Sequence, residues 1–213
     1  ASRTAPPIPG LFFDQSIHLP HDLCITLYTS LDETYFSPSS SSHKTNQIML
    51  FGRAGSQGYG LPPLLETLLT SLSTILRPHL DDHTYALLFP PNPQRARQAI
   101  INMYDPGEGI SPHVDLLRRF GDGIIGVSLG SGCAMQFVRV ATDDGEDKQA
   151  YELYLPEGSV LVLTGDARYH WTHGIEGRLA DDVSTDQGIE KVERRRRISV
   201  TLRWLLEGAD IVG

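Results

Sequence analysis

The stretch Asn-Met-Tyr-Asp-Pro-Gly-Glu-Gly-Ile-Ser-Pro-His-Val-Asp, residues 102–115, is the part of the chain around which we expect the fold to be organised. It begins as a strand, because residues 98–104 alternate and are rich in Ile and aromatic side chains. The sequence Asp105-Pro106-Gly107 then predicts a turn, since proline fixes φ and glycine accepts a positive φ. At the end of the stretch, His113 and Asp115 share one face of an extended segment.

Beyond Pro93 the sequence favours short strands separated by glycine-containing turns. This spacing indicates a mainly β domain with flanking helices (α+β), built as a double-sheet jelly roll or barrel. The predicted strands are Gln98–Tyr104, Ile124–Gly130, Cys133–Val140, Tyr151–Leu155, Ser159–Leu163 and Arg197–Trp204.

Before Pro93, apolar periodicity predicts two helices that pack outside one sheet. Leu recurs at four-residue spacing in Leu19–Leu31, and a second apolar stripe follows Pro62-Pro63 and stops at Pro78. The acid-rich segment Glu176–Glu193 is interpreted as a loop between core strands. With no internal repeat, residues 1–213 are expected to form one domain.

Composition narrows the class of protein. Apolar residues make up 40% and charged residues 21%, no apolar run approaches the ~20 residues that span a bilayer, and the start lacks a signal-peptide pattern. We therefore expect an intracellular protein of the nucleus or cytoplasm with no membrane segment. Cys24 and Cys133 are expected to be buried thiols in a reducing compartment.

The net charge of −8 argues against a generally basic protein that coats nucleic acid. Only three of the 18 basic residues are Lys, and Arg clusters at 118–119 and 194–197, while acids gather at 143–147 and 181–193. Arg suits two-pronged recognition of carboxylate or phosphate. The alternative interpretation is a solvated, charged surface.

A second histidine-bearing stretch is Tyr169-His170-Trp171-Thr172-His173-Gly174-Ile175. His173 is favoured over His170, because Gly174 permits close backbone approach and Trp171 supplies apolar shielding. With His113 and Asp115 it would complete a two-His-one-carboxylate triad, which holds Fe(II) and leaves other coordination positions open. The alternative is that these are ordinary hydrogen-bonded histidines.

In the predicted strand Arg197–Trp204, residues 197, 199, 201 and 203 share one face, which therefore carries two guanidinium groups. Burying them is costly unless anions pair with them, and a dicarboxylate held at both ends would do so. Alternatively, this face looks toward water or pairs with internal carboxylates.

Taken in order, these motifs resemble the AlkB family of Fe(II)- and 2-oxoglutarate-dependent dioxygenases, from about Phe12 to Trp204. The resemblance implies a double-stranded β-helix (jelly roll) and an enzyme that uses Fe(II), 2-oxoglutarate and O₂. It implies that iron binds the catalytic residues His113, Asp115 and His173. It implies that 2-oxoglutarate binds Asn102, Tyr104, Arg197 and Arg203, with Ser199 as a further polar contact.

By the same resemblance, the expected reaction is oxidative demethylation of N-alkylated nucleobases in methylated DNA or RNA, preferably single-stranded, with loss of formaldehyde. Residues 45–60 would form a substrate lid, with Phe51 and Tyr59 stacking on a base and Arg118 close to a phosphate.

Two departures keep other substrates open. Leu117 stands where the best-known bacterial repair member has a second acid, and residues 167–175 look more like the tRNA-modifying and protein-acting branches. The alternatives are therefore the same chemistry on a protein side chain or a tRNA wobble modification, or a non-catalytic binding module on this fold. The intact ligand set and both arginines argue against the non-catalytic module.

Overall fold

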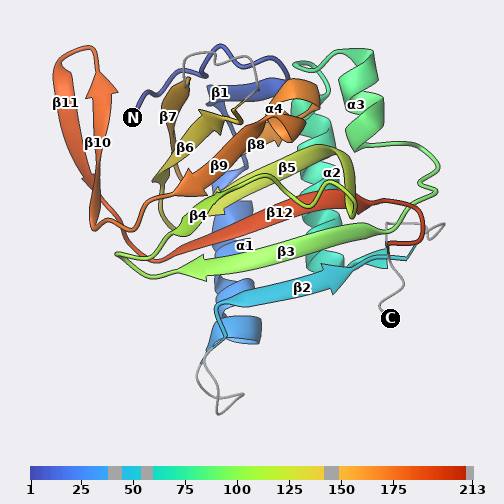
Figure 1. Cartoon of the computed structure of the whole chain (residues 1–213). Helices are drawn as coiled ribbons and strands as arrows, with labels where there is room; N and C mark the ends of the chain where they lie inside the picture. Colours follow the sequence, from blue (N-terminus) through green and yellow to red (C-terminus); the bar gives the residue numbers. More distant parts are fainter. Residues whose placement is uncertain (38–44, 54–59, 142–148, 210–213) are drawn as a thin grey trace.

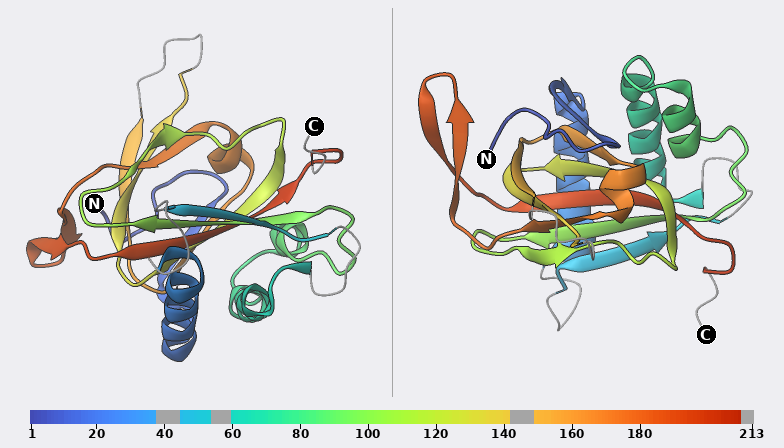
Figure 2. Two further views of the ribbon diagram at one scale, coloured as in Figure 1. Left: turned by 90° about the horizontal axis from the view of Figure 1, so that it is seen from below. Right: turned by 45° about the horizontal axis from the view of Figure 1, so that its top comes forward.

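The computed structural model describes residues 1–37, 45–53, 60–141 and 149–209, and ten of the strands in these residues form two antiparallel sheets that face each other (Figures 1 and 2). Within these residues the larger sheet has the order β1-β8-β5-β12-β3-β2 and the smaller has the order β4-β9-β6-β7. This is the jelly roll that the strand spacing predicts. The strands of the two sheets are β1 Leu11–His18, β2 Gln47–Phe51, β3 Arg97–Tyr104, β4 Ile110–His113, β5 Phe120–Leu129, β6 Cys133–Arg139, β7 Ala150–Leu155, β8 Ser159–Leu163, β9 Trp171–Ile175 and β12 Arg197–Leu205.

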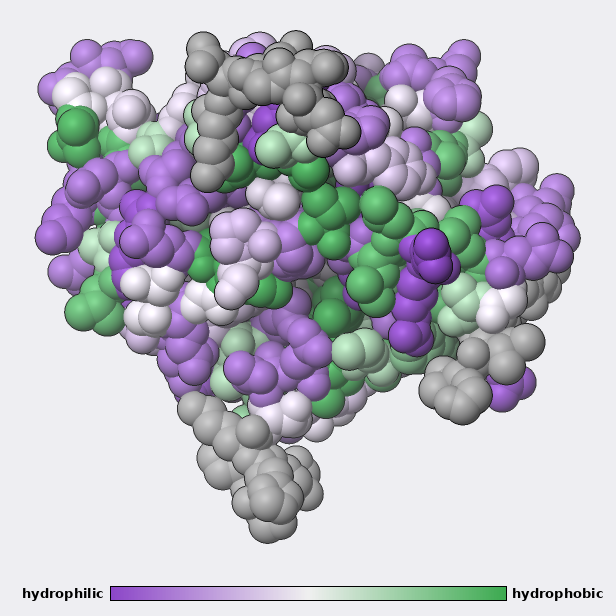
Figure 3. Space-filling model, viewed as in Figure 1, coloured by the Kyte–Doolittle hydropathy of each residue, from purple (hydrophilic) through white to green (hydrophobic). Residues whose placement is uncertain are grey.

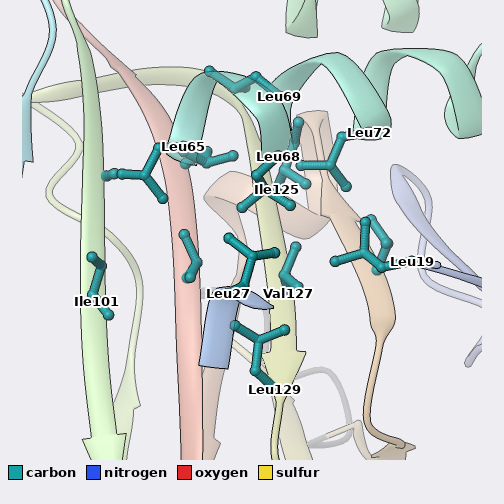
Figure 4. Close-up of a cluster of buried hydrophobic side chains, with 14 of the residues drawn as sticks. Leu19, Leu27, Leu65, Leu68, Leu69, Leu72, Ile101, Ile125, Val127 and Leu129 are labelled. Atoms are coloured by element: carbon teal, nitrogen blue, oxygen red, sulfur yellow. The ribbon is translucent and has the colours of Figure 1, made fainter. Parts of the chain in front are cut away.

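Helices α1, α2 and α3 cover the outer face of the larger sheet, on the side away from the smaller sheet (Figure 2, left), whereas α4 packs against apolar residues between the sheets. Leu27 of α1 and Leu68 of α2 are fully buried against strand residues such as Val127, as Figure 4 shows. Each such leucine contributes about 1.5–3 kcal/mol by burial, so this layer fixes the larger sheet from outside. The helices are α1 His21–Leu31, a π-helical turn Asp32–Phe36, α2 Pro63–Leu76, α3 Asp82–Leu88 and α4 Gly165–Tyr169.

A second apolar cluster lies between the sheets. Phe13, Leu163, Phe137 and Trp171 pack there and are buried. The remaining interior between the sheets is lined by apolar side chains, such as Ile100 and Leu161, and by polar side chains from β3, β4, β9 and β12. The sandwich is thus filled at one end and hollow at the other, and the hollow end is where a ligand would enter.

The prediction of a loop at Glu176–Glu193 is wrong. Residues there form the hairpin β10 Ala180–Thr185 and β11 Gly188–Glu193, which projects from one end of the molecule (Figure 1). Acidic side chains hid the alternation, which is real: Asp181 and Val183 are buried. The turn closes at Gly188, whose φ of 126° suits glycine.

Three shorter elements were also missed. Gly165-Asp166 begins helix α4, and Ser111-Pro112 lies inside the short strand β4. Helix α3 begins after Asp81, whose side chain accepts a hydrogen bond from the Thr84 amide at 2.9 Å. This is an N-cap that the sequence does contain.

No helix within the described residues is long and apolar enough to cross a membrane.

Candidate active site

His113, Asp115 and His173 come together at the hollow end of the sandwich. His113 ends β4 and lies directly opposite His173 on β9, with the two rings 4.6 Å apart. Asp115 follows just after the strand and is buried, and one potential ligand atom from each residue lies within 4.8 Å of the others. The structure therefore gathers two imidazoles and one carboxylate, the donor set of a facial triad.

Gly174 allows this approach, as the sequence predicted. A Cβ at this position would lie 2.8 Å from the Cα of Pro112, so any larger residue would push β4 away from β9. His170, the competing histidine, is exposed and bonds to Asp166 through its Nδ1 at 3.0 Å. Its side chain does not line the cavity.

Both imidazoles offer a ring nitrogen as a potential metal ligand. Nδ1 of His113 donates to the carbonyl of Ser111 at 2.8 Å, which leaves the lone pair of Nε2 for another partner. Burial lowers the pKa of His173 to about 4, so its ring is neutral at physiological pH. Neutral imidazole is the form that binds a metal ion.

The Asp115 carboxylate is held at one oxygen and open at the other. Its Oδ1 accepts a hydrogen bond from Nη1 of Arg203, while its buried Oδ2 has no hydrogen-bond partner among the described residues. Arg203 is itself fixed by Gln98, whose Oε1 accepts from Nε at 2.7 Å, and lies 3.6 Å from the centre of the Phe120 ring. A buried carboxylate oxygen without a partner fits a bound cation.

Arg197, at the other end of β12, has hydrogen-bond donors that the described residues do not satisfy. Its Nη2 donates to Oγ of Ser128 at 2.9 Å, but its buried Nε and Nη1 have no acceptor among the described residues. The Tyr104 ring lies 5.5 Å away, and burial raises the pKa of its phenol, which stays a neutral donor. This end of the site fits an anionic group.

A cavity of about 340 Å³ joins the two ends. It is large enough for a small dicarboxylate beside a metal ion. All the residues predicted for metal and 2-oxoglutarate line it, namely His113, Asp115, His173, Asn102, Tyr104, Arg197, Ser199 and Arg203.

Ser128 and Gln98 were missed as functional residues. Ser128 lies opposite Ser199 across the β5–β12 ladder, and Gln98 lies opposite Arg203 across the β3–β12 ladder. The signal was therefore cross-strand register, because directly opposite residues share a face. Register cannot be read from the sequence of either strand alone.

The cavity mouth is apolar. Leu116 and Leu117 are exposed directly after Asp115, and Met49 and Phe51 are exposed on the cavity-facing side of edge strand β2. Figure 3 shows apolar surface in the middle of the face that Figure 1 views, bordered by hydrophilic residues. Of the predicted substrate residues, Phe51 and Arg118 are exposed. Tyr59 lies outside the described residues.

One part of the arginine prediction is wrong. Arg194, in the 194–197 cluster for which recognition of a carboxylate or phosphate or a solvated surface was expected, is buried and bonds to both oxygens of Asp181 at 2.6 and 2.7 Å. Arg196 bonds to Asp105 at 2.9 Å. Arg194 holds the hairpin, because a buried guanidinium needs an anion close by. The exposed Arg196 pairs with the β3–β4 connection at Asp105.

The sequence pattern of the 2OG-Fe(II) oxygenase superfamily matches residues 52–203. The chain belongs to this superfamily. The match spans the triad and both arginines of β12, so this oxygenase uses Fe(II), 2-oxoglutarate and O₂. Asp115 Oδ2 and the free donors of Arg197 give the metal and the cosubstrate fitting partners.

Relatives of this oxygenase agree with the AlkB resemblance. It is 42% identical over 90 residues to the macaque tRNA (carboxymethyluridine(34)-5-O)-methyltransferase ALKBH8, covering 42% of this chain and 13% of that protein. It is 41% identical over 104 residues to the mouse mitochondrial alkB homolog 7, covering 49% and 43%. A mimivirus protein, L905, is 39% identical over 114 residues, covering 54% and 50%. The chain thus spans half or less of the length of these relatives.

Solved structures show the same fold. OsALKBH1 superposes with a TM-score of 0.51 at 17% identity, covering 92% of this chain and 98% of that one. A Pseudomonas putida prolyl-4-hydroxylase superposes with a TM-score of 0.53 at 15% identity, covering 93% and 94%. The jelly roll and its flanking helices are therefore shared with oxygenases of very different sequence.

Proposed function

We propose that this AlkB-family oxygenase oxidatively removes N-alkyl groups from nucleobases of single-stranded RNA or DNA. The observation that carries the chemistry is the pair of unfilled hydrogen-bonding positions in one cavity, Oδ2 of Asp115 and the free nitrogens of Arg197. In this proposal His113, Asp115 and His173 hold Fe(II). Asn102, Tyr104, Arg197 and Ser199 hold 2-oxoglutarate, with Arg203 between the two.

Iron with 2-oxoglutarate and O₂ supplies hydroxylation of a substrate C–H bond, and an N-methyl group hydroxylated in this way is lost as formaldehyde. The protein's own residues bind and orient. Arg197 and Tyr104 receive one carboxylate of the cosubstrate, Arg203 orients Asp115, and the apolar lining at Ile100 and Leu161 limits water around the reacting atoms.

A nucleic acid is proposed as the substrate because of the side chains at the cavity mouth and the names of the relatives. Phe51 offers an exposed aromatic surface on which a base extruded into the cavity could stack, and Arg118 is a nearby exposed cation. Relatives are named for RNA, including an N6-methyladenosine RNA demethylase of Cryphonectria parasitica that is 32% identical over 90 residues.

A second candidate is the same chemistry on a protein side chain or a tRNA wobble nucleotide. The internal ion pairs of two arginines favour this candidate. Because Arg194 and Arg196 are already paired with carboxylates, few cations are left to bind a long phosphate backbone. A compact, apolar target would suit Leu116 and Leu117 at the mouth.

Turnover with defined substrates decides between these functions. The protein with Fe(II), ascorbate and 2-oxoglutarate should form succinate, and a methylated single-stranded oligonucleotide should lose the mass of one methylene group (CH₂) per event. No succinate would establish a non-catalytic module. Succinate with methyl loss only from tRNA or histone peptides would select the second candidate.

Binding by fluorescence anisotropy tests the mouth. Phe51→Ala should weaken oligonucleotide binding by about 1–3 kcal/mol, whereas Ile189→Ala, an exposed residue on the remote hairpin, should not. Arg118→Gln should reduce the salt slope by about 0.7 if it contacts one phosphate of a single strand. Arg77→Gln serves as the control for Arg118→Gln, because Arg77 is an exposed cation at the end of α2, on the helix-covered side of the larger sheet. Equal binding by Phe51→Ala and wild type would remove Phe51 from the substrate site.

A further inference from the structure

Arg168 is a buried cation that the site described so far does not use. It lies on α4, does not line the cavity, and is 2% exposed. All three of its guanidinium nitrogens donate to main-chain carbonyls: Nη1 to Asp115 at 3.1 Å, Nη2 to Phe120 at 3.1 Å and Nε to Gly121 at 3.2 Å. No ion pair joins it to a carboxylate within the part of the chain that the structure describes.

Such an arrangement is costly as packing alone. A guanidinium loses its hydration when it is buried. Interactions with carbonyl dipoles offset less of that free-energy cost than an ion pair with a carboxylate would. An apolar side chain of similar volume would fill the space without this penalty. What Arg168 adds is its rigid planar fork, which joins three carbonyls at fixed spacing.

These carbonyls flank the connection between β4 and β5, because Asp115 lies just after β4, and Phe120 and Gly121 begin β5. Between them, the amides of Arg119 and Phe120 bond to the carbonyl of Leu116 in a tight turn. Leu116 and Leu117 are exposed, so this turn has little packing of its own. Contacts at its ends therefore decide where Asp115 sits.

Helix α4 is in turn attached to the larger sheet. The carboxylate of Asp122 on β5 accepts from the amide of Gly165 at 2.9 and 3.2 Å. Along the chain, Arg168 precedes His173 by five residues, and Asp166 of the same helix bonds to the indole of Trp171 at 3.0 Å. Arg168 thus ties the segment that carries Asp115 to the segment that carries His173.

Resting on the proposed function, we propose that Arg168 is a positioning residue that sets the geometry of the metal triad by clamping the main chain of the Asp115 segment to the His173 segment. Arg203 and Arg168 then hold different parts of Asp115. Arg203 holds Oδ1 of the Asp115 side chain and Arg168 holds its main-chain oxygen. The two contacts leave Oδ2 available to a metal ion.

The test compares Arg168→Lys with Arg97→Lys in the whole chain. Lysine keeps the charge but cannot bridge three carbonyls. Arg97 is an equally buried arginine that bonds to the carbonyl of Leu88 and does not line the cavity. Mn(II) affinity, measured by electron paramagnetic resonance, should fall about 10- to 100-fold in Arg168→Lys and stay within twofold in Arg97→Lys. In metal-free protein, amides 116–121 should exchange hydrogen faster only in Arg168→Lys.

Wild-type Mn(II) affinity in Arg168→Lys, with a thermal midpoint lowered as in Arg97→Lys, would overturn the proposal and leave Arg168 a stabilising residue. If Arg168→Lys does not fold, Asp122→Ala replaces it, because loosening α4 should weaken Mn(II) binding in the same direction by several-fold. Unchanged affinity there would also overturn it. The proposed function fails in a different way: wild-type protein that binds no Mn(II), or His113→Ala that binds it normally.

Discussion

The two ends of strand β12 carry the same buried side chain in two different situations. Arg203 is satisfied from within the protein, by Asp115 and by Gln98. Arg197 has one protein acceptor, Ser128, and two buried nitrogens without one among the described residues. A guanidinium with internal partners belongs to the architecture of the site, whereas one with unfilled donors is arranged for a ligand.

The difference assigns separate tasks to residues that share one face of one strand. In the proposed function, the Arg203 end orients a metal ligand, and the Arg197 end receives a cosubstrate carboxylate. Variants at the two ends should therefore separate metal affinity from 2-oxoglutarate affinity.

The largest effect is expected at the triad itself, next to Arg203. His113→Ala removes a ligand on β4 and should abolish 2-oxoglutarate turnover while the fold, measured by circular dichroism, is retained. His173→Ala should behave alike, and His170→Ala, on an exposed side chain, should not. Turnover at the wild-type rate by His113→Ala would break the triad assignment.

Arg197→Met comes next. Losing a charge-assisted contact in a buried site costs about 2–5 kcal/mol, so 2-oxoglutarate affinity should fall about 30-fold or more. Mn(II) affinity without cosubstrate should not change. Isothermal titration of each ligand measures both. The neighbouring, exposed Arg196→Met is the matched control, and equal 2-oxoglutarate affinities in the two variants would contradict the assignment.

Arg203→Met should show the opposite pattern. Without its partner, Oδ1 of Asp115 is unsatisfied and the carboxylate loses its orientation, so Mn(II) affinity should fall about 10- to 100-fold. The 2-oxoglutarate affinity, measured at saturating Mn(II), should fall less than in Arg197→Met. A fall confined to 2-oxoglutarate would show that the two arginines do the same work and would remove the distinction between the strand ends.

The smallest effect is expected at Ser128, which fixes Arg197 by one neutral acceptor. Ser128→Ala removes a hydrogen bond worth about 0.5–1.5 kcal/mol, so 2-oxoglutarate affinity should fall about 2- to 10-fold and Mn(II) affinity should not change. A loss as large as that of Arg197→Met would mean that Ser128 contacts the cosubstrate itself.

Much of this site could be predicted because its residues lie in short local patterns. The spacing of His113 and Asp115, the glycine after His173 and the alternation from Arg197 to Arg203 each carry geometric information within a few residues. The same holds for the six predicted strands, which are all present, with β5 beginning earlier, at Phe120.

What could not be predicted depends on register or on long-range pairing. The two arginines of β12 look equivalent in sequence, and only the pairing of Arg203 with Gln98 and Asp115 separates them. Asp181 likewise looked like part of an acidic loop until Arg194 was found to pair with it inside the hairpin. The clamp at Arg168 joins residues about fifty positions apart and leaves no local pattern.

The unfilled nitrogens of Arg197 also have a consequence for the lifetime of the protein. The empty molecule must fold around a buried charge that is only partly solvated, so whatever occupies the cavity also stabilises the native state. A cosubstrate at a hundred times its dissociation constant adds about 2.7 kcal/mol to the free energy of unfolding. A change of that size alters how often a chain opens to proteases, so we expect the abundance of this oxygenase to follow the supply of its own cosubstrate.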